Sequence, residues 1–166
     1  TNGTAILGLG DIGAVAGMPV MEGKAALMAS LACLNAVPIL TELRDPEQLV
    51  DVIAAIAPSF GAIQLEDIAA PDCFTIEDRL RERVGIPVLH DDQHGTAVVA
   101  LAAVRNAGRM VGQRLSQSVV GQIGLGAAGI GICRLLLARG VETVLGSDLD
   151  PGALARFEAM GGQPAD

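Results

Sequence analysis

The sequence predicts an α/β protein in which a catalytic part, built on a parallel sheet, is followed by part of a Rossmann-like dinucleotide-binding domain. Short apolar runs rich in β-branched residues alternate with longer runs of helical periodicity, and this alternation is typical of a parallel sheet with crossover helices. In the second half, a glycine-rich loop, GLGAAG, lies between two such runs. We place the boundary after residue 92, which gives a catalytic part over residues 1–92 and a nucleotide-binding part over residues 93–166.

Local signals place the individual elements. In the first part we expect strands over residues 5–9, 37–43, 62–68 and 86–89, and helices over residues 24–36, 46–57 and 74–84. A helix over residues 96–110 opens the second part. In the second part we expect a strand and a helix on either side of the glycine loop, a strand over 143–149 and a helix over 151–160. Asp45, Pro46 and Gln48 stand in the order of an N-cap, a first-turn proline and a capping-box partner.

Two of the expected strands end in a pair of acids. Glu66 and Asp67 follow one, and Asp91 and Asp92 follow another. The carboxyl ends of parallel strands share one edge of a sheet, where ligands bind, so all four carboxylates can converge there. Such a cluster needs a cation, and hard oxygen ligands favour Mg²⁺ or Mn²⁺. A plainer interpretation of Asp91 and Asp92 is that they cap the following helix.

Lys24 is a candidate base at the same edge. It is the only lysine, whereas arginine occurs ten times, and an ammonium group can lose its proton where a guanidinium cannot. We expect Lys24 near a helix N-terminus, where the macrodipole disfavours a positive charge. An arginine-rich coding bias explains the composition equally well. His90 and His94 stand four residues apart and could ligate a softer metal, but we favour hydrogen-bonding or structural roles for them.

The loop GLGAAG has the context of a dinucleotide site. Gly124, Gly126 and Gly129 follow a strand and open a helix, with Ala127 and Ala128 between them, and Asp148 lies 24 residues after Gly124. That is close to the spacing of the acid that binds a ribose 2′-hydroxyl, so we expect NAD in preference to NADP.

An earlier loop has the same glycine spacing, at Gly8, Gly10 and Gly13. We discount it because Asp11 would oppose a pyrophosphate, and because no strand ending in an acid follows at the usual distance.

Composition excludes several classes of partner. The net charge of the 166 residues is −8 and no basic run is present, which argues against nucleic acid or an anionic membrane surface. No apolar run reaches the roughly 18 residues that span a bilayer. Cys33, Cys73 and Cys133 form no CxxC motif, so we expect a reduced, cytoplasmic protein in which they are small core residues.

Five runs together resemble one family. GTAILGLGDIG, PVMEGKA, APSFGAIQLEDI, IPVLHDDQHGTA and GAAGIGI occur in the order and spacing of the bacterial malic enzymes, and the similarity extends over essentially the whole chain. The resemblance implies oxidative decarboxylation of (S)-malate to pyruvate and CO₂, with NAD or NADP and a divalent metal. It further implies that Lys24 is the general base, that Asp91 contacts this lysine, and that Glu66, Asp67 and Asp92 are the metal ligands.

The chain also departs from that family. It contains no tyrosine, although a tyrosine protonates the enolpyruvate in malic enzymes, and the family's substrate-binding asparagines after the nucleotide motif are absent. We therefore expect an internal fragment, inactive by itself, of an enzyme that is a homodimer at full length. Two alternatives remain open: a malolactic enzyme, which converts malate to lactate and CO₂, and a catalytically incomplete binding module.

Overall fold

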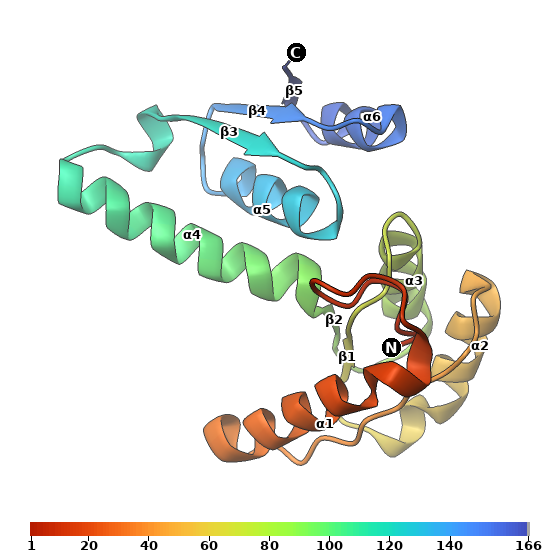
Figure 1. The fold of residues 1–166 in the computed structure, drawn as a ribbon. Helices are drawn as coiled ribbons and strands as arrows, with labels where there is room; N and C mark the ends of the chain where they lie inside the picture. Colours follow the sequence, from red (N-terminus) through yellow and green to blue (C-terminus); the bar gives the residue numbers. More distant parts are fainter. Residues whose placement is uncertain (166) are drawn as a thin grey trace. The chain divides into compact units, whose positions relative to one another are not determined.

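The structure, a computed structural model, describes residues 1–165 and divides into two compact units, residues 1–89 and residues from His90 onward. Each unit mixes helices with short strands (Figure 1), so the predicted α/β class is confirmed. No helix within residues 1–165 has the length and apolar character needed to cross a membrane.

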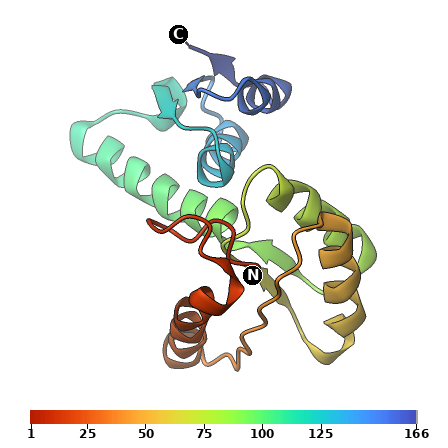
Figure 2. The same cartoon turned by 45° about the vertical axis from the view of Figure 1, so that its right-hand side comes forward.

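The first unit is built around a small sheet. Its elements are α1 (Gly13–Ala32), α2 (Pro46–Ile56), the short 3₁₀ turn η1 (Ala57–Ser59), β1 (Ile63–Leu65), α3 (Asp72–Arg83) and β2 (Val88–His90), whose last residue opens the second unit. Strands β1 and β2 pair (Figure 2). The Ile63 N–H donates to the Pro87 carbonyl at 2.9 Å, which brings the two strand starts together, so the strands run in the same direction as predicted.

Helix α2 forms for the reasons that its sequence gives. Asp45 is the N-cap and accepts a hydrogen bond from the Gln48 N–H at 2.9 Å, and Pro46 is the first helical residue. The helix buries Leu49 and packs against α3, which buries Leu80. Exposed ion pairs also join the two helices, Arg79 with Glu47 and Arg83 with Asp51.

Helix α1 corrects the expected position of Lys24. The helix begins at Gly13, so Lys24 lies well inside it and away from the N-terminal dipole. The sequence predicts a helix start at Lys24 because Pro19 and Gly23 precede it, and both residue types usually interrupt helices. Proline removes one backbone hydrogen bond, and glycine costs about 1 kcal/mol relative to alanine, yet the helix of 20 residues continues through both.

Two expected strands are absent within residues 1–89. Residues 5–9 make a tight turn with one antiparallel bridge, Ile6 to Gly10. Residues 37–43 make hydrogen bonds with Thr1 and Asn2: the Thr41 N–H donates to the Thr1 carbonyl, the Thr1 ammonium donates to the Ile39 carbonyl, and the Asn2 side-chain amide donates to the Leu43 carbonyl, each at 3.1 Å. An apolar run without a continuous ladder does not become a strand.

The second unit is the first half of a doubly wound sheet. Its elements are α4 (Asp91–Val111), the 3₁₀ turn η2 (Leu115–Gln117), β3 (Val119–Ile123), α5 (Ala127–Ala138), β4 (Thr143–Ser147), α6 (Pro151–Ala159) and β5 (Gln163–Pro164). The strands lie in the order β3-β4-β5 and are parallel, with Val120 opposite Val144 and Leu145 opposite Gln163. This is the strand order of one mononucleotide-binding half.

Helix α4 begins five residues earlier than predicted, at Asp91 and not at Thr96. Gly95, which precedes the predicted start, lies inside the helix. The two acids are therefore first-turn residues, where they interact favourably with the macrodipole. The N-cap position belongs to His90, so the interpretation of Asp91 and Asp92 as caps is wrong.

Glycines allow the close packing of the second unit. Figure 1 shows α5 between α4 and the β3–β4 pair. A Cβ at Gly131 of α5 would stand 2.4 Å from the Gln93 carbonyl oxygen of α4. On β4, a Cβ at Gly146 would stand 2.4 Å from the ring of Phe157, which is fully buried. The core of this unit depends on backbone surfaces that approach each other directly.

The cysteines are free thiols, as expected for a reduced protein. Cys73 and Cys133 are buried, and burial raises the pKa of Cys133 to about 11, which keeps this thiol protonated. The prediction is wrong for Cys33. It is exposed at the end of α1, with a φ of 54°.

We predict that Gly131→Ala destabilises the protein by about 1–3 kcal/mol, because the new methyl group would overlap backbone atoms that cannot move aside easily. The measurement is the free energy of unfolding in urea. Gly23→Ala is the matched control, since Gly23 is also helical but has nothing within 4 Å of the added Cβ. Equal stability of the two variants would show that α4 and α5 can separate without cost.

Candidate active site

Lys24, Glu66 and Gln64 form a connected polar group in the first unit. The Lys24 Nζ lies 2.9 Å from Glu66 Oε1, and the Gln64 Nε2 donates to Glu66 Oε2 at 2.8 Å. The Glu66 side chain is 7% exposed, against 35% for Lys24. Both oxygens of this buried carboxylate are therefore oriented, one by a cation and the other by an amide.

The periodicity of the elements explains how these side chains meet. Gln64 and Glu66 are two residues apart along β1 and its extension, which places them on one face. Lys24 continues the stripe of Ala14, Gly17 and Met21, the residues that α1 buries, because residues three and four apart share a helix face. Gln64 was missed in the sequence, although its i, i+2 relation to Glu66 was a readable signal.

Asp67 occupies an unusual backbone conformation beside Glu66. Its φ is 53°, and its carbonyl accepts hydrogen bonds from the N–H groups of Thr4 and Ala5, both at 3.1 Å. The Thr4 hydroxyl oxygen also accepts from the Ala69 N–H at 2.9 Å. The segment that starts the chain thus holds the backbone around the acid pair, a role for Thr4 that no sequence motif indicated.

The acid pair is chemically suited to a divalent cation. Glu66 and Asp67 are 5% and 3% exposed, and a carboxylate oxygen of each lies within 4.8 Å of the other. Two buried carboxylates so close repel each other unless positive charge is near. Oxygen donors of this kind fit Mg²⁺ or Mn²⁺ better than a soft metal.

An ion pair between Asp11 and Arg44 lies at the first glycine-rich turn, residues 8–13. Arg44 donates to both carboxylate oxygens of Asp11, at 2.5 and 3.0 Å, and these hydrogen bonds hold the pKa of Asp11 below its usual value. Gly8 and Gly10 have positive φ angles of 77° and 72°. The glycines here serve a tight turn that the Asp11–Arg44 pair ties to the segment before α2.

Asp91 and Asp92 begin α4 in the second unit. The Asp91 carboxylate folds back over Gly95, where a Cβ would stand 2.3 Å from Asp91 Oδ1. Asp92 Oδ2 lies 3.6 Å from Nε2 of His90, whose side chain is fully buried. The glycine at position 95 therefore leaves room for the Asp91 side chain against the helix.

The second glycine loop has the geometry of a nucleotide loop. Gly124 has a φ of 84°, Gly126 is the N-cap of α5, and Ala127 and Ala128 are the first helical residues. A Cβ at Gly129 would stand 2.0 Å from the Gly124 carbonyl oxygen. Nucleotide-binding loops of this kind need glycines for three reasons: a tight turn, close approach of the backbone to a phosphate, and close packing of the helix.

Asp148 closes this loop from the end of β4. Its Oδ1 accepts from the Asp150 N–H at 2.9 Å, and its Oδ2 accepts from the Leu125 N–H at 2.6 Å. These backbone hydrogen bonds, the one from Asp150 first, lower the pKa of Asp148. The structure thus brings Asp148 and the glycine loop together, as the spacing in the sequence predicted.

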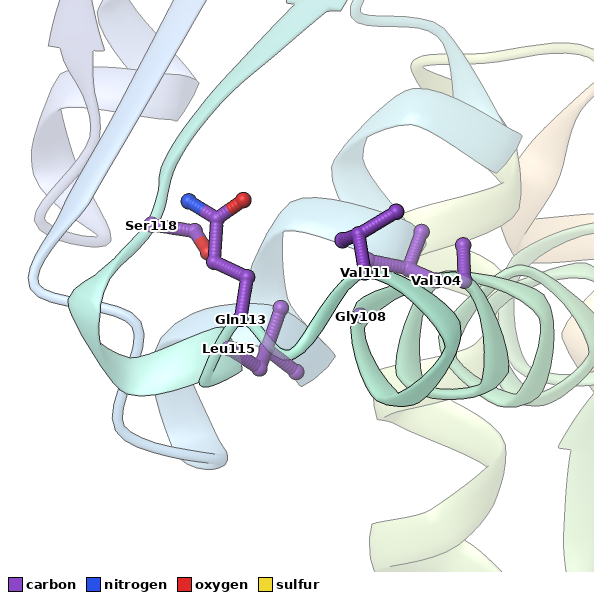
Figure 3. Close-up of a pocket in the computed structure, with 7 residues that line it drawn as sticks. Val104, Gly108, Val111, Gln113, Leu115 and Ser118 are labelled. Atoms are coloured by element: carbon purple, nitrogen blue, oxygen red, sulfur yellow. The ribbon is translucent and has the colours of Figure 1, made fainter.

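A cavity of about 230 Å³ lies elsewhere in the second unit, at the C-terminal end of α4 (Figure 3). Its lining is small and mostly apolar, with only Gln113 and Ser118 as polar side chains. None of the lining residues is titratable, and none belongs to the predicted site. It offers no groups for acid, base or metal chemistry.

The geometry defines a class: an α/β protein with a lysine–carboxylate site and half of a dinucleotide-binding sheet. Comparison with known families agrees. Residues 1–45 and 40–81 match the malic enzyme N-terminal domain, and residues 93–150 match the malic enzyme NAD-binding domain. The chain belongs to the malic enzyme family.

Individual relatives support this assignment. NAD-dependent malic enzyme 1 of Bacillus subtilis is 58% identical over 98% of the chain, and NADP-dependent malic enzyme of Haemophilus influenzae is 51% identical over 86%. A bifunctional malic/malolactic enzyme of B. subtilis is 49% identical over 89%. The chain spans 37%, 19% and 36% of these proteins, respectively.

A solved structure shows the same fold. The malic enzyme of Pyrococcus horikoshii superimposes with a TM-score of 0.87 at 47% identity, covering 92% of this chain and 36% of that one.

We predict that Asp148→Asn destabilises the second unit at pH 7, because the amide would turn an N–H toward one of the two backbone donors. A lowered pKa contributes stability above the unfolded value of about 3.9, and this contribution is lost as the pH falls through the folded value. The difference from wild type in urea unfolding should therefore shrink from pH 5 downward. Glu158→Gln, at an exposed position of α6, is the control. A deficit that stays constant with pH would contradict this account.

Proposed function

We propose that the protein acts in the oxidative decarboxylation of (S)-malate to pyruvate and CO₂ with NAD(P), and that Lys24 is its general base. The observation that carries this proposal is the 2.9 Å contact between Lys24 and the buried carboxylate of Glu66, beside Asp67. Family membership supports it, since both domains of malic enzymes are matched.

In this proposal each residue has a defined task. Glu66, Asp67 and Asp92 hold the cation, and Asp91 contacts Lys24. Strands β1 and β2 support this set, because Glu66 and Asp67 directly follow β1 while Asp91 and Asp92 directly follow β2. Gln64 keeps the Glu66 carboxylate oriented, as partners of metal ligands commonly do.

Lys24 accepts the proton of the malate C2 hydroxyl as the C2 hydrogen leaves with its electron pair. The buried acids Glu66 and Asp67 would hold the divalent cation beside this amine. When bound, Mg²⁺ or Mn²⁺ supplies Lewis acidity at the reacting oxygen atoms, and the nicotinamide supplies the hydride acceptor.

The second unit is proposed to bind the dinucleotide. The backbone of Gly124, Gly126 and Gly129, with Ala127 and Ala128 at the start of α5, faces the pyrophosphate. Asp148 binds the adenosine ribose and favours NAD over NADP, since it would repel a 2′-phosphate. We further propose a cytoplasmic homodimer.

The chain is 49% identical in sequence to a bifunctional malic/malolactic enzyme. This similarity favours one alternative, the release of lactate without net redox change. Incubating the full-length enzyme with malate and a catalytic amount of NAD separates the two activities. Pyruvate and NADH in equal amounts, limited by the NAD added, indicate malic activity, whereas lactate in excess of the NAD indicates malolactic activity.

We predict that Glu66→Gln and Asp92→Asn strongly weaken Mn²⁺ binding in the full-length enzyme, measured by calorimetric titration, because each removes a charged ligand. Gln64→Leu should weaken it by roughly 10-fold or more by releasing the Glu66 carboxylate. Asp45→Asn, which keeps an N-cap far from this group, is the control. Unchanged Mn²⁺ affinity in Asp92→Asn would sink the assignment of that ligand.

The base is tested by Lys24→Arg in the full-length enzyme. Arginine keeps the positive charge beside Glu66 but cannot accept a proton at neutral pH, so we predict that the hydride step slows by roughly 10²-fold or more. Single-turnover NADH formation measures this step directly. Arg44→Lys, an exchange at the exposed Asp11 pair, is the control. Near-normal turnover in Lys24→Arg would overturn the assignment.

A further inference from the structure

A second acid, Asp150, shares the loop between β4 and α6 with Asp148, and an arginine of α6, Arg156, reaches back to it. Asp150 is the N-cap of α6 and accepts from the N–H groups of Gly152 and Ala153, at 2.9 and 3.1 Å. Its Oδ2 also accepts from Nη2 of Arg156 at 3.4 Å. One carboxylate therefore both starts the helix and holds the arginine.

Arg156 is folded back toward the start of its own helix. A Cβ added at Gly152 would lie 3.4 Å from Arg156 Nη1, so the guanidinium lies close to the Gly152 backbone, and its side chain is 34% exposed. Its positive charge also acts on Asp148, as one of the smaller influences that lower the pKa of that acid. Arg156 thus lies in the field of two carboxylates.

This arrangement matters for a nucleotide whose adenosine ribose is bound by Asp148. A 2′-phosphate at that ribose would add negative charge beside both acids. The cation best suited to bind it, a guanidinium with its planar set of donors, is already held by Asp150.

We propose that the Asp150–Arg156 pair, together with Asp148, determines the preference for NAD by withholding Arg156 from a 2′-phosphate. This inference rests on the proposed nucleotide-binding function, and it adds two specificity residues, Asp150 and Arg156, to that site. A purely structural role for the pair, as a brace at the start of α6, is the alternative that the experiment must separate.

The experiment compares kcat/KM for NAD and NADP in the full-length enzyme. Asp150→Asn keeps an N-cap oxygen but removes the charge, and Asp148→Asn does the same at the ribose acid. We expect Asp150→Asn to raise the NADP-to-NAD ratio by up to about 5-fold, which corresponds to an exposed ion pair, and the double variant to raise the ratio further, because a second negative charge near the 2′-phosphate is removed. NADP affinity without malate, measured calorimetrically, should rise in parallel.

Arg156→Met provides the decisive comparison. Added to Asp150→Asn or to the double variant, it should abolish most of the gain with NADP, measured as the ratio of kcat/KM for the two cofactors. In the wild-type background it should leave the cofactor ratio nearly unchanged. If circular dichroism shows that the double variant is unfolded, Asp150→Asn is compared with and without Arg156→Met, which gives the same test.

The outcomes separate the two proposals. A gain with NADP that survives Arg156→Met, or a wild-type enzyme that prefers NADP, overturns the role of the Asp150–Arg156 pair and leaves the nucleotide site in place. A wild-type enzyme that binds neither cofactor overturns the proposed function itself.

Discussion

The first unit depends on the burial of two adjacent carboxylates at the end of β1. Removing charge from water is costly unless cations and hydrogen bonds surround it, and several parts of the unit contribute these partners. Helix α1 supplies Lys24 and β1 supplies Gln64, both to Glu66. The start of the chain donates two backbone N–H groups to the Asp67 carbonyl. Segments far apart in the sequence are positioned by one polar centre, which is also the proposed site of chemistry.

The second unit is constrained by close approach and not by buried charge. Where Gly129 passes Gly124, Gly131 passes Gln93 and Gly146 faces Phe157, a methyl group would overlap its neighbour. Asp148 then joins the glycine loop to the next strand end through its bonds to Leu125 and Asp150. The loop leads directly into the N-terminus of α5, which is the feature that the proposed pyrophosphate binding requires.

Sequence-based prediction succeeded where the interactions are local and failed where they join distant parts of the chain. Local signals were reliable: Asp45 and Pro46 start α2, and the Gly124 loop lies where its spacing placed it. Signals that depend on distant partners were not. The run 37–43 has strand composition, but its observed partners are Thr1 and Asn2 and not a neighbouring strand. Gln64 became meaningful only once Glu66 was seen to accept its hydrogen bond. Helix starts also misled, because Pro19 and Gly95 are tolerated inside helices.

The arginines that form ion pairs and the single lysine differ in the burial of their partners. Arg44, Arg79, Arg83 and Arg156 each pair with an exposed or half-exposed acid, and pairs of this kind contribute only about 0–1 kcal/mol to stability. The single lysine is different, because its partner is the buried Glu66. A guanidinium there would be a permanent cation, whereas an amine can exchange its proton. The use of lysine at this position alone agrees with the proposed role of Lys24 as the base, because that role requires an amine.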